Sequence, residues 1–142
     1  MRKIFLFSLM IIFSLGLIPV NASAAGANKV IYHINLGNEQ ATDALRNIKN
    51  HLAVDPKVKI VVVTHSTGVD FLLEGAEDKN GNSYSGPVAE LAAKGVDFRV
   101  CQITLERRKI DLKKVIPEAK LVPSGVVEVT RLQQEGYAYL KP

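Results

Sequence analysis

The sequence predicts a single α/β domain with a mainly parallel sheet of about five strands. Short runs of apolar and β-branched residues alternate with segments whose apolar residues recur every three to four positions. The connections between them are short, and no internal repeat or low-complexity tract interrupts the pattern. The length suits one hydrophobic core and not two.

The N-terminus has the organisation of a secretory signal peptide. Met1-Arg2-Lys3 is basic, residues 4–20 form an apolar run without charges, and Ala22-Ser23-Ala24 offers an A-x-A cleavage site. We therefore expect a signal peptide over residues 1–24, with cleavage before Ala25. The domain then spans residues 25–142.

The alternative is a leader that stays in the membrane as an anchor. The apolar run contains Gly16 and Pro19 and is near the lower length limit of about 17–25 residues for a membrane span. We therefore expect a periplasmic or secreted protein, with no stable membrane insertion after signal cleavage.

Charge argues against nucleic acid as a partner. The formal net charge is +4, and Arg2 and Lys3 of the leader contribute two of these charges. The densest basic stretch, Glu106-Arg107-Arg108-Lys109, is not interleaved with aromatic residues. We interpret it as a solvated surface turn.

The first half of the domain predicts two strands, each followed by a helix. Residues 29–36 form the first strand. The helix after it ends near Asp55-Pro56, and its apolar face consists of Ala41, Ala44, Leu45, Ile48 and Leu52. Residues 59–64 are a continuous apolar and β-branched run, typical of a central strand covered on both faces. Residues 69–73 can form a short helix.

The second half predicts three more strands. A Gly-, Asn- and Asp-rich loop over residues 74–85 precedes a helix that starts near Pro87 and ends at Gly95. The strands are expected at residues 97–101, 120–123 and 137–140, with a short helical or irregular segment up to Pro117 between the first two. Ser124 is the expected cap of a last helix, which Gly136 ends.

Cys101 is the single cysteine, so no intrachain disulfide can form. Its thiol is a buried inert group, half of an intermolecular bond, or a free reactive group. In a parallel sheet, reactive groups collect outside the carboxyl ends of the strands. Cys101 and His65 both end strands, so they share this edge if their strands are neighbours. Cys101 is therefore the candidate catalytic residue, and His65 its possible neighbour.

Three segments carry a resemblance to a known family: residues 95–105 around Cys101, residues 63–66 at a strand end, and residues 122–139 at the C-terminus. Together they resemble the DsrE/DsrF-like family over nearly the whole domain. The resemblance implies a compact three-layer sandwich and a homo-oligomer, a trimer or hexamer. It also implies a sulfur carrier in which Cys101 accepts sulfur as a persulfide and exchanges it with donor and acceptor proteins. The sulfur-relay members are cytoplasmic, so an exported chain would need other partners.

Two alternatives remain open beside a sulfur carrier or sulfurtransferase-like protein. One is a non-catalytic binding or assembly module with Cys101 packed in a core or subunit interface. The other is a soft-metal site made by Cys101 with His65 or His33, although neither C-x-x-C nor closely spaced histidines are present. Without a P-loop or G-x-G-x-x-G motif we expect no cofactor, and our primary prediction includes no metal. His33 and His51 are not expected in the site.

Overall fold

The computed structural model describes residues 28–142, so the predicted leader lies outside the described residues. Five strands form one parallel sheet in the order β4-β3-β2-β1-β5. The strands are β1 (Lys29–Ile34), β2 (Lys59–Thr64), β3 (Asp97–Cys101), β4 (Ala119–Val122) and β5 (Ala138–Leu140). The helices are α1 (Asn38–Val54), η1 (Ser66–Leu72), α2 (Ser85–Ala93), α3 (Gln102–Arg107), η2 (Leu112–Lys114) and α4 (Gly125–Gln134).

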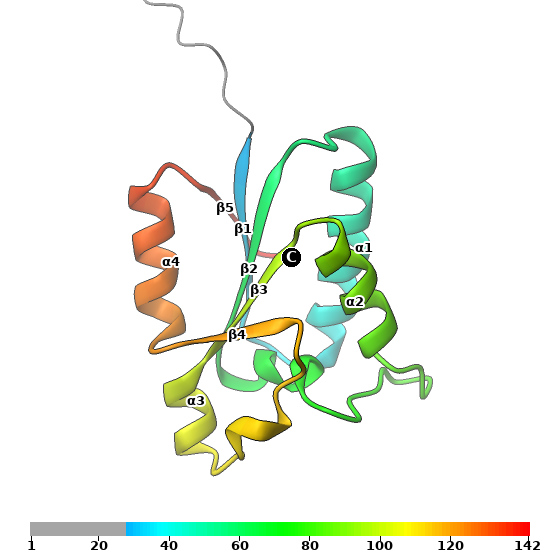
Figure 1. Cartoon of the computed structure of the whole chain (residues 1–142), viewed down its shortest axis with the longest axis vertical. Helices are drawn as coiled ribbons and strands as arrows, with labels where there is room; N and C mark the ends of the chain where they lie inside the picture. The colour runs from blue at the N-terminus through cyan, green and yellow to red at the C-terminus, as the bar shows by residue number, and fades with distance from the viewer. Residues whose placement is uncertain (1–27) are drawn as a thin grey trace, which may run out of the picture.

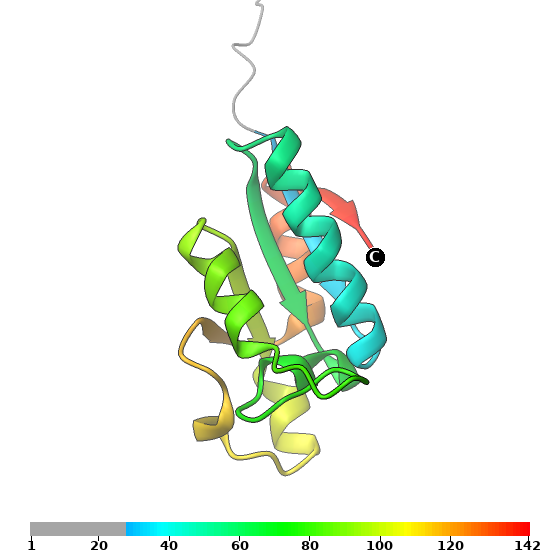
Figure 2. The ribbon, with the colours of Figure 1, turned by 90° about the vertical axis from the view of Figure 1, so that its right-hand side faces the viewer.

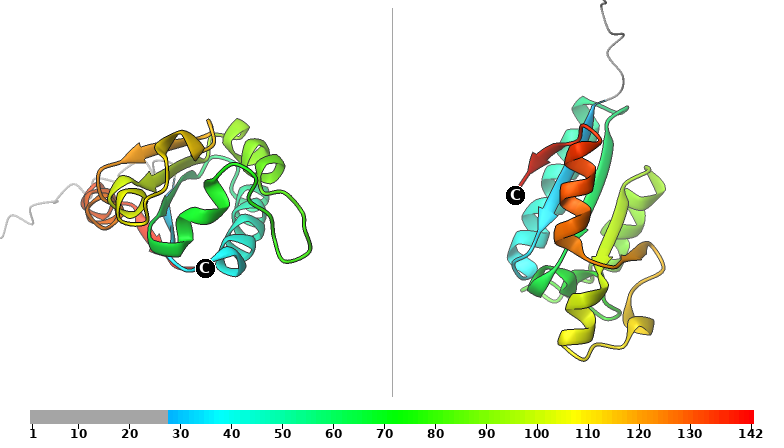
Figure 3. Two further views of the ribbon diagram at one scale, coloured as in Figure 1. Left: turned by 90° about the horizontal axis from the view of Figure 1, so that it is seen from below. Right: turned by 90° about the vertical axis from the view of Figure 1, so that its left-hand side faces the viewer.

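The domain has three layers, as the sequence and the family resemblance predict. Helices α1 and α2 cover one face of the sheet and α4 covers the other (Figure 1). Figure 2 shows α1 and α2 in front of the strands, and the right-hand view of Figure 3 shows α4 on the opposite face. The short helix α3 continues beyond the end of β3 (Figure 1).

Alternation along the strands divides the buried side chains between the two faces. The larger core faces α1 and α2, and its strand residues are Val30, Tyr32, Ile34, Ile60, Val62, Phe98 and Val100. The smaller core lies under α4 and consists of Ile31, Val61, Val63, Val129 and Leu132. Each such side chain contributes about 1.5–3 kcal/mol when fully buried. Because the core under α4 is the smaller of the two, this face of the sheet also accommodates polar side chains.

Predicted and observed elements differ mainly at strand and helix ends, where hydrogen bonds between side chains and the backbone decide the boundary. β2 and β3 have the predicted bounds. β1 ends at Ile34 and not at Leu36, because the amides of Asn35 and Leu36 donate to the side chain of Gln40, at 2.9 and 2.8 Å. Ser124 occupies the N-cap position of α4, but its side chain makes no capping hydrogen bond, contrary to the prediction.

The segment after β2 is a 3-10 helix that begins at Ser66, earlier than the helix expected at residues 69–73. Ser66 has a φ of 54°, and Gly68 lies so close to the end of β1 that an added Cβ would be 2.3 Å from the carbonyl oxygen of Ile34. Among residues 28–142, no helix combines the length and apolar character needed to cross a bilayer.

Candidate functional site

The topology places Cys101 at the carboxyl edge of the parallel sheet, at the end of β3. Strands β1 to β4 are added one after another toward one edge, and the chain then crosses through α4 to place β5 at the opposite edge. The last residue of β3 is Cys101, which pairs with Val122 at the end of β4. The chain leaves β3 into α3 and leaves β4 into α4. Ligands of α/β proteins bind outside the carboxyl ends of the strands, the edge at which Cys101 lies.

Cys101 is buried but does not belong to either apolar core. Its relative exposure is 5 %, and neither of the two hydrophobic clusters contains it. It occupies the N-cap position of α3 with an extended backbone. The sulfur is therefore enclosed at the carboxyl edge of the sheet, beside helix N-termini, and not within aliphatic packing.

Hydrogen-bond donors around Cys101 favour its thiolate. Burial by itself would raise the pKa, but the Thr104 hydroxyl and the amides of Gly125, Thr104 and Ile103 outweigh it and lower the pKa of Cys101. The amide of Ser66 donates to the Thr104 hydroxyl oxygen at 3.1 Å, so that hydroxyl keeps its own hydrogen for the sulfur. Two of the amides belong to the first turn of α3 and one to the first turn of α4.

Gly125 brings the start of α4 into contact with the ends of β2 and β3. A Cβ at this position would lie 3.0 Å from the Thr64 carbonyl oxygen, 3.1 Å from the Cβ of His65 and 3.3 Å from the Cβ of Cys101. Only glycine fits without displacing these atoms. His65 and Cys101 therefore flank one residue, which agrees with the shared sheet edge expected from the sequence.

Three ring side chains, starting from His65 beside Gly125, form a hydrogen-bonded row. His33 Nε2 lies 2.7 Å from His65 Nε2, and His33 Nδ1 lies 2.7 Å from the Tyr139 hydroxyl oxygen. The row runs from the edge strand β5 across β1 to the end of β2. We did not expect His33 in the site. Its position in β1 opposite Val63, on the same face as Ile31, was the signal that it points toward α4.

Both histidines in this row resist protonation. Burial, followed by repulsion from His65 and Lys141, lowers the pKa of His33 to about 4. Burial and Lys141 also lower the pKa of His65. The pair is therefore neutral at neutral pH. Its Nε2–Nε2 hydrogen bond needs at least one neutral imidazole, because one of the two nitrogens must accept. Within residues 28–142, no group of three or more His, Cys, Asp or Glu is arranged so that it could hold a metal ion.

An ion-pair network connects the Cys101 strand to α4. Arg99, two residues before Cys101 on the same face of β3, contacts Asp97 at 2.6 Å and also pairs with Glu128 of α4. Arg131 binds the same Glu128 carboxylate at 2.8 Å. Burial opposes the charge on Arg99, but the two carboxylates raise its pKa. The network leaves Arg99 charged and fixed in place.

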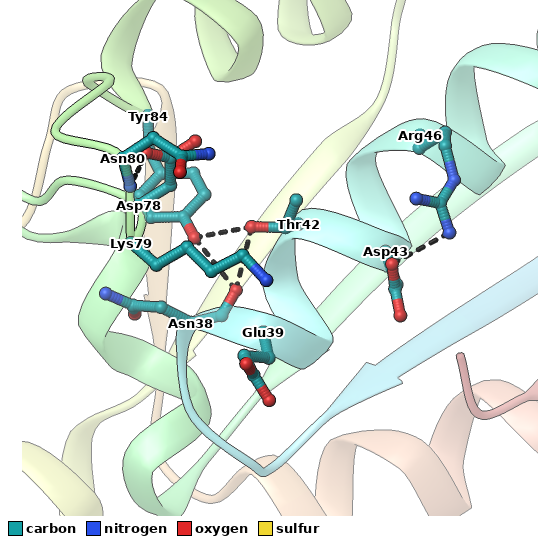
Figure 4. Close-up of a pocket in the computed structure, with 9 residues that line it drawn as sticks. All are labelled: Asn38, Glu39, Thr42, Asp43, Arg46, Asp78, Lys79, Asn80 and Tyr84. Atoms are coloured by element: carbon teal, nitrogen blue, oxygen red, sulfur yellow. Dashed lines mark hydrogen bonds and ion pairs between the residues drawn. The ribbon is translucent and has the colours of Figure 1, made fainter.

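A pocket of about 390 Å³ lies between the start of α1 and the loop before α2 (Figure 4), and α1 covers the face of the sheet opposite α4 (Figure 1). Within the pocket lining, the Tyr84 hydroxyl donates to the Asn38 carbonyl at 2.8 Å and lies 2.7 Å from the Thr42 hydroxyl. Asp78 on its rim accepts hydrogen bonds from the amides of Asn80 and Asn82 in its own loop. These polar groups satisfy one another, so we do not assign the pocket a function.

Fold and site together define a class: a single α/β domain with one cysteine at the carboxyl edge of a parallel sheet, held beneath two helix N-termini. Residues 29–142 match the DsrE/DsrF-like family. The chain belongs to this family.

Among the solved structures that resemble the chain are the following two. One is the protein of unknown function MTH1491 from Methanobacterium thermoautotrophicum, with 34% sequence identity and a TM-score of 0.73. The other is the ychN protein from E. coli, with 17% identity and a TM-score of 0.69, a similarity that concerns the fold alone. Each comparison covers 81% of this chain and 99% of the other. No curated protein matches the chain.

Proposed function

We propose that this protein is an exported sulfur carrier that accepts sulfane sulfur on Cys101 as a persulfide and passes it to an acceptor. The observation that carries the proposal is the environment of the Cys101 sulfur, where one hydroxyl and three amides favour the thiolate despite burial. A thiolate is the form that attacks sulfur. Membership of the DsrE/DsrF-like family agrees with this chemistry.

The loading step is an exchange between a thiolate and a persulfide. The Cys101 thiolate attacks the outer sulfur of a donor persulfide or hydropolysulfide, and a new S–S bond forms to Cys101. The S–S bond of the donor breaks, and its inner sulfur leaves as a thiolate with the bonding electron pair. Attack by an acceptor thiolate on the outer sulfur of the loaded protein repeats the exchange and regenerates Cys101. No net oxidant is consumed.

The apolar rim beside Cys101 supports exchange with a partner protein. Ile103 in α3 is 42% exposed and Val126 in α4 is 61% exposed, and each adjoins a residue that contacts Cys101 or its sulfur. Exposed apolar groups at a reactive residue suit a protein donor or acceptor. We also propose that the protein is periplasmic or secreted and forms a homo-oligomer, a trimer or hexamer, as the family resemblance implies.

Intact-mass spectrometry tests the loading step. Folded protein is incubated with inorganic polysulfide, and Cys101→Ser serves as the matched control. The proposal expects a gain of about 32 Da, one sulfur atom, on the native protein alone, and dithiothreitol removes it. Absence of the adduct on folded native protein would refute the proposal.

One observation favours a second candidate, a non-catalytic binding or assembly module. Cys101 is only 5 % exposed, which suits a packed structural side chain. The two candidates differ in the reactivity of the thiol. A structural cysteine is alkylated slowly in the folded state and rapidly after unfolding, whereas a carrier cysteine is alkylated in the folded state with a rate that follows its thiolate.

A further inference from the structure

We infer that Arg99 and Glu128 are positioning residues whose ion pair holds the start of α4 against Cys101. The inference deepens the proposed function by naming what sets the reactivity of the carrier thiol. It rests on three features of the second face of the sheet: how α4 is attached, how Arg99 is fixed, and how closely Gly125 approaches Cys101.

Apolar contacts attach α4 to only part of the sheet. Val129 and Leu132 pack on Ile31 of β1 and on Val61 and Val63 of β2. None of these strand residues belongs to β3, the strand that carries Cys101. The pair between Arg99 and Glu128 supplies the link to β3. Without it, α4 could tilt away from β3 while its apolar contacts with β1 and β2 remain.

The link is rigid at both ends. Arg99 and Glu128 have side-chain exposures of only 18% and 11%. Asp97 holds the guanidinium from the other side through Nε and Nη2, at 3.2 and 2.6 Å. The Glu128 amide donates to the Ser124 carbonyl at 3.0 Å, the first backbone bond of α4. The position of Glu128 therefore fixes residues 124 and 125.

Small displacements of α4 would alter the close approach of Gly125 to Cys101. Because a Cβ on Gly125 would be only 3.3 Å from the Cβ of Cys101, a modest tilt of α4 changes what surrounds the sulfur. The Gly125 amide is one of the donors that favour the Cys101 thiolate. A displaced helix would withdraw this donor and the positive end of the α4 dipole together.

The test measures alkylation of Cys101 by iodoacetamide as a function of pH, a reaction that needs no sulfur donor. Glu128→Ala removes the link to β3. We expect the pH midpoint to move upward and alkylation below the midpoint to slow about two- to fivefold, the loss of one helix-terminus interaction. Glu128→Gln, which keeps an acceptor for Arg99, restores most of the rate. Glu135→Ala, which removes the other partner of Arg131 at the far end of α4, matches the native protein.

The direction in which the pH midpoint of alkylation moves distinguishes a positioning role of Glu128 from a purely electrostatic one. If the Glu128 carboxylate acted only through its charge, its removal would leave the Arg99 cation to stabilise the thiolate, and the midpoint would fall. A fall, or no change, overturns the inference. Arg99→Lys is a second variant that keeps the charge but not the forked contacts to both carboxylates; we expect it to slow alkylation, and an unchanged rate contradicts us. Failure of persulfide loading would refute the carrier function and leave this result standing.

Discussion

Gly125 lies so close to Cys101 across the end of the sheet that a Cβ added to it would be 3.3 Å from the Cβ of Cys101. This close approach joins the first residue of α4 to the last residue of β3. It explains why a glycine follows Ser124 where most residues could start a helix. It also provides a direct way to perturb the site from the backbone.

Gly125→Ala should destabilise the fold. The added methyl group also meets the Thr64 carbonyl oxygen at 3.0 Å, and a backbone carbonyl in the sheet cannot move aside cheaply. We expect a loss of about 1–3 kcal/mol in the free energy of unfolding, measured with urea. Gly86→Ala in α2 is the matched control, because nothing lies within 4 Å of its added Cβ. An equal loss in both variants would contradict the tight contact at Gly125.

Thr104→Val should make Cys101 less reactive. The substitution preserves the shape of residue 104 but removes the hydroxyl donor that helps to lower the pKa of Cys101. Alkylation of the folded protein near neutral pH should slow about two- to tenfold, the equivalent of one hydrogen bond. Thr104→Ser keeps the hydroxyl and should retain the native rate. A rate for the valine variant equal to the native rate would exclude the hydroxyl from thiolate stabilisation.

His33→Gln should reduce the acid sensitivity of the fold. The pKa of His33 is about 4 in the folded protein, below its ordinary value of 6.5, so the unfolded chain binds the proton first as pH falls. The native protein therefore loses stability from about pH 6.5 down to about pH 4.

Glutamine can bond to Tyr139 and His65 without titrating. After allowance for solvent screening, we expect the native protein to lose about 1–2 kcal/mol more than the variant across this range. Urea unfolding of both proteins at pH 7 and pH 4 measures the difference. Equal losses of stability in the native protein and the variant would mean that His33 has the same pKa in the folded and unfolded protein, contrary to our expectation.

Expression of the full chain with its own N-terminus tests export. We expect the protein in the periplasm or medium, with an intact mass that corresponds to residues 25–142. The basic start, apolar run and Ala22-Ser23-Ala24 motif are the basis for this expectation. A product that retains Met1 and stays with the membrane would contradict it.

The sequence predicted the fold well because strand and helix periodicities differ and the connections are short. The β-branched run of β2 and the alternation of β3 predicted both strands with their observed bounds. Prediction was weaker where side chains replaced backbone partners. Gln40 ends β1 early, and Ser124 occupies the cap position without using its side chain. Neither outcome follows from local pattern, because both depend on tertiary contacts.

The candidate site was predictable only in outline. Strand-end positions brought Cys101 and His65 to one edge of the sheet, but sequence spacing contained no signal for the Thr104 hydroxyl or the Gly125 amide. His33 was missed because a histidine inside a strand commonly faces solvent. The structure places it opposite Val63, on the face where α4 covers only part of the sheet.

The central claim is that Cys101 both takes up and returns sulfur, and a single-turnover experiment tests it most directly. Native protein loaded with one sulfur atom is freed of donor and mixed with an excess of a small acceptor thiol, and its mass is followed over time. A carrier should lose about 32 Da in one phase as the outer sulfur appears on the acceptor, and then accept sulfur again. A protein that never gains the sulfur, or holds it irreversibly in the presence of the thiol, would not be a sulfur carrier.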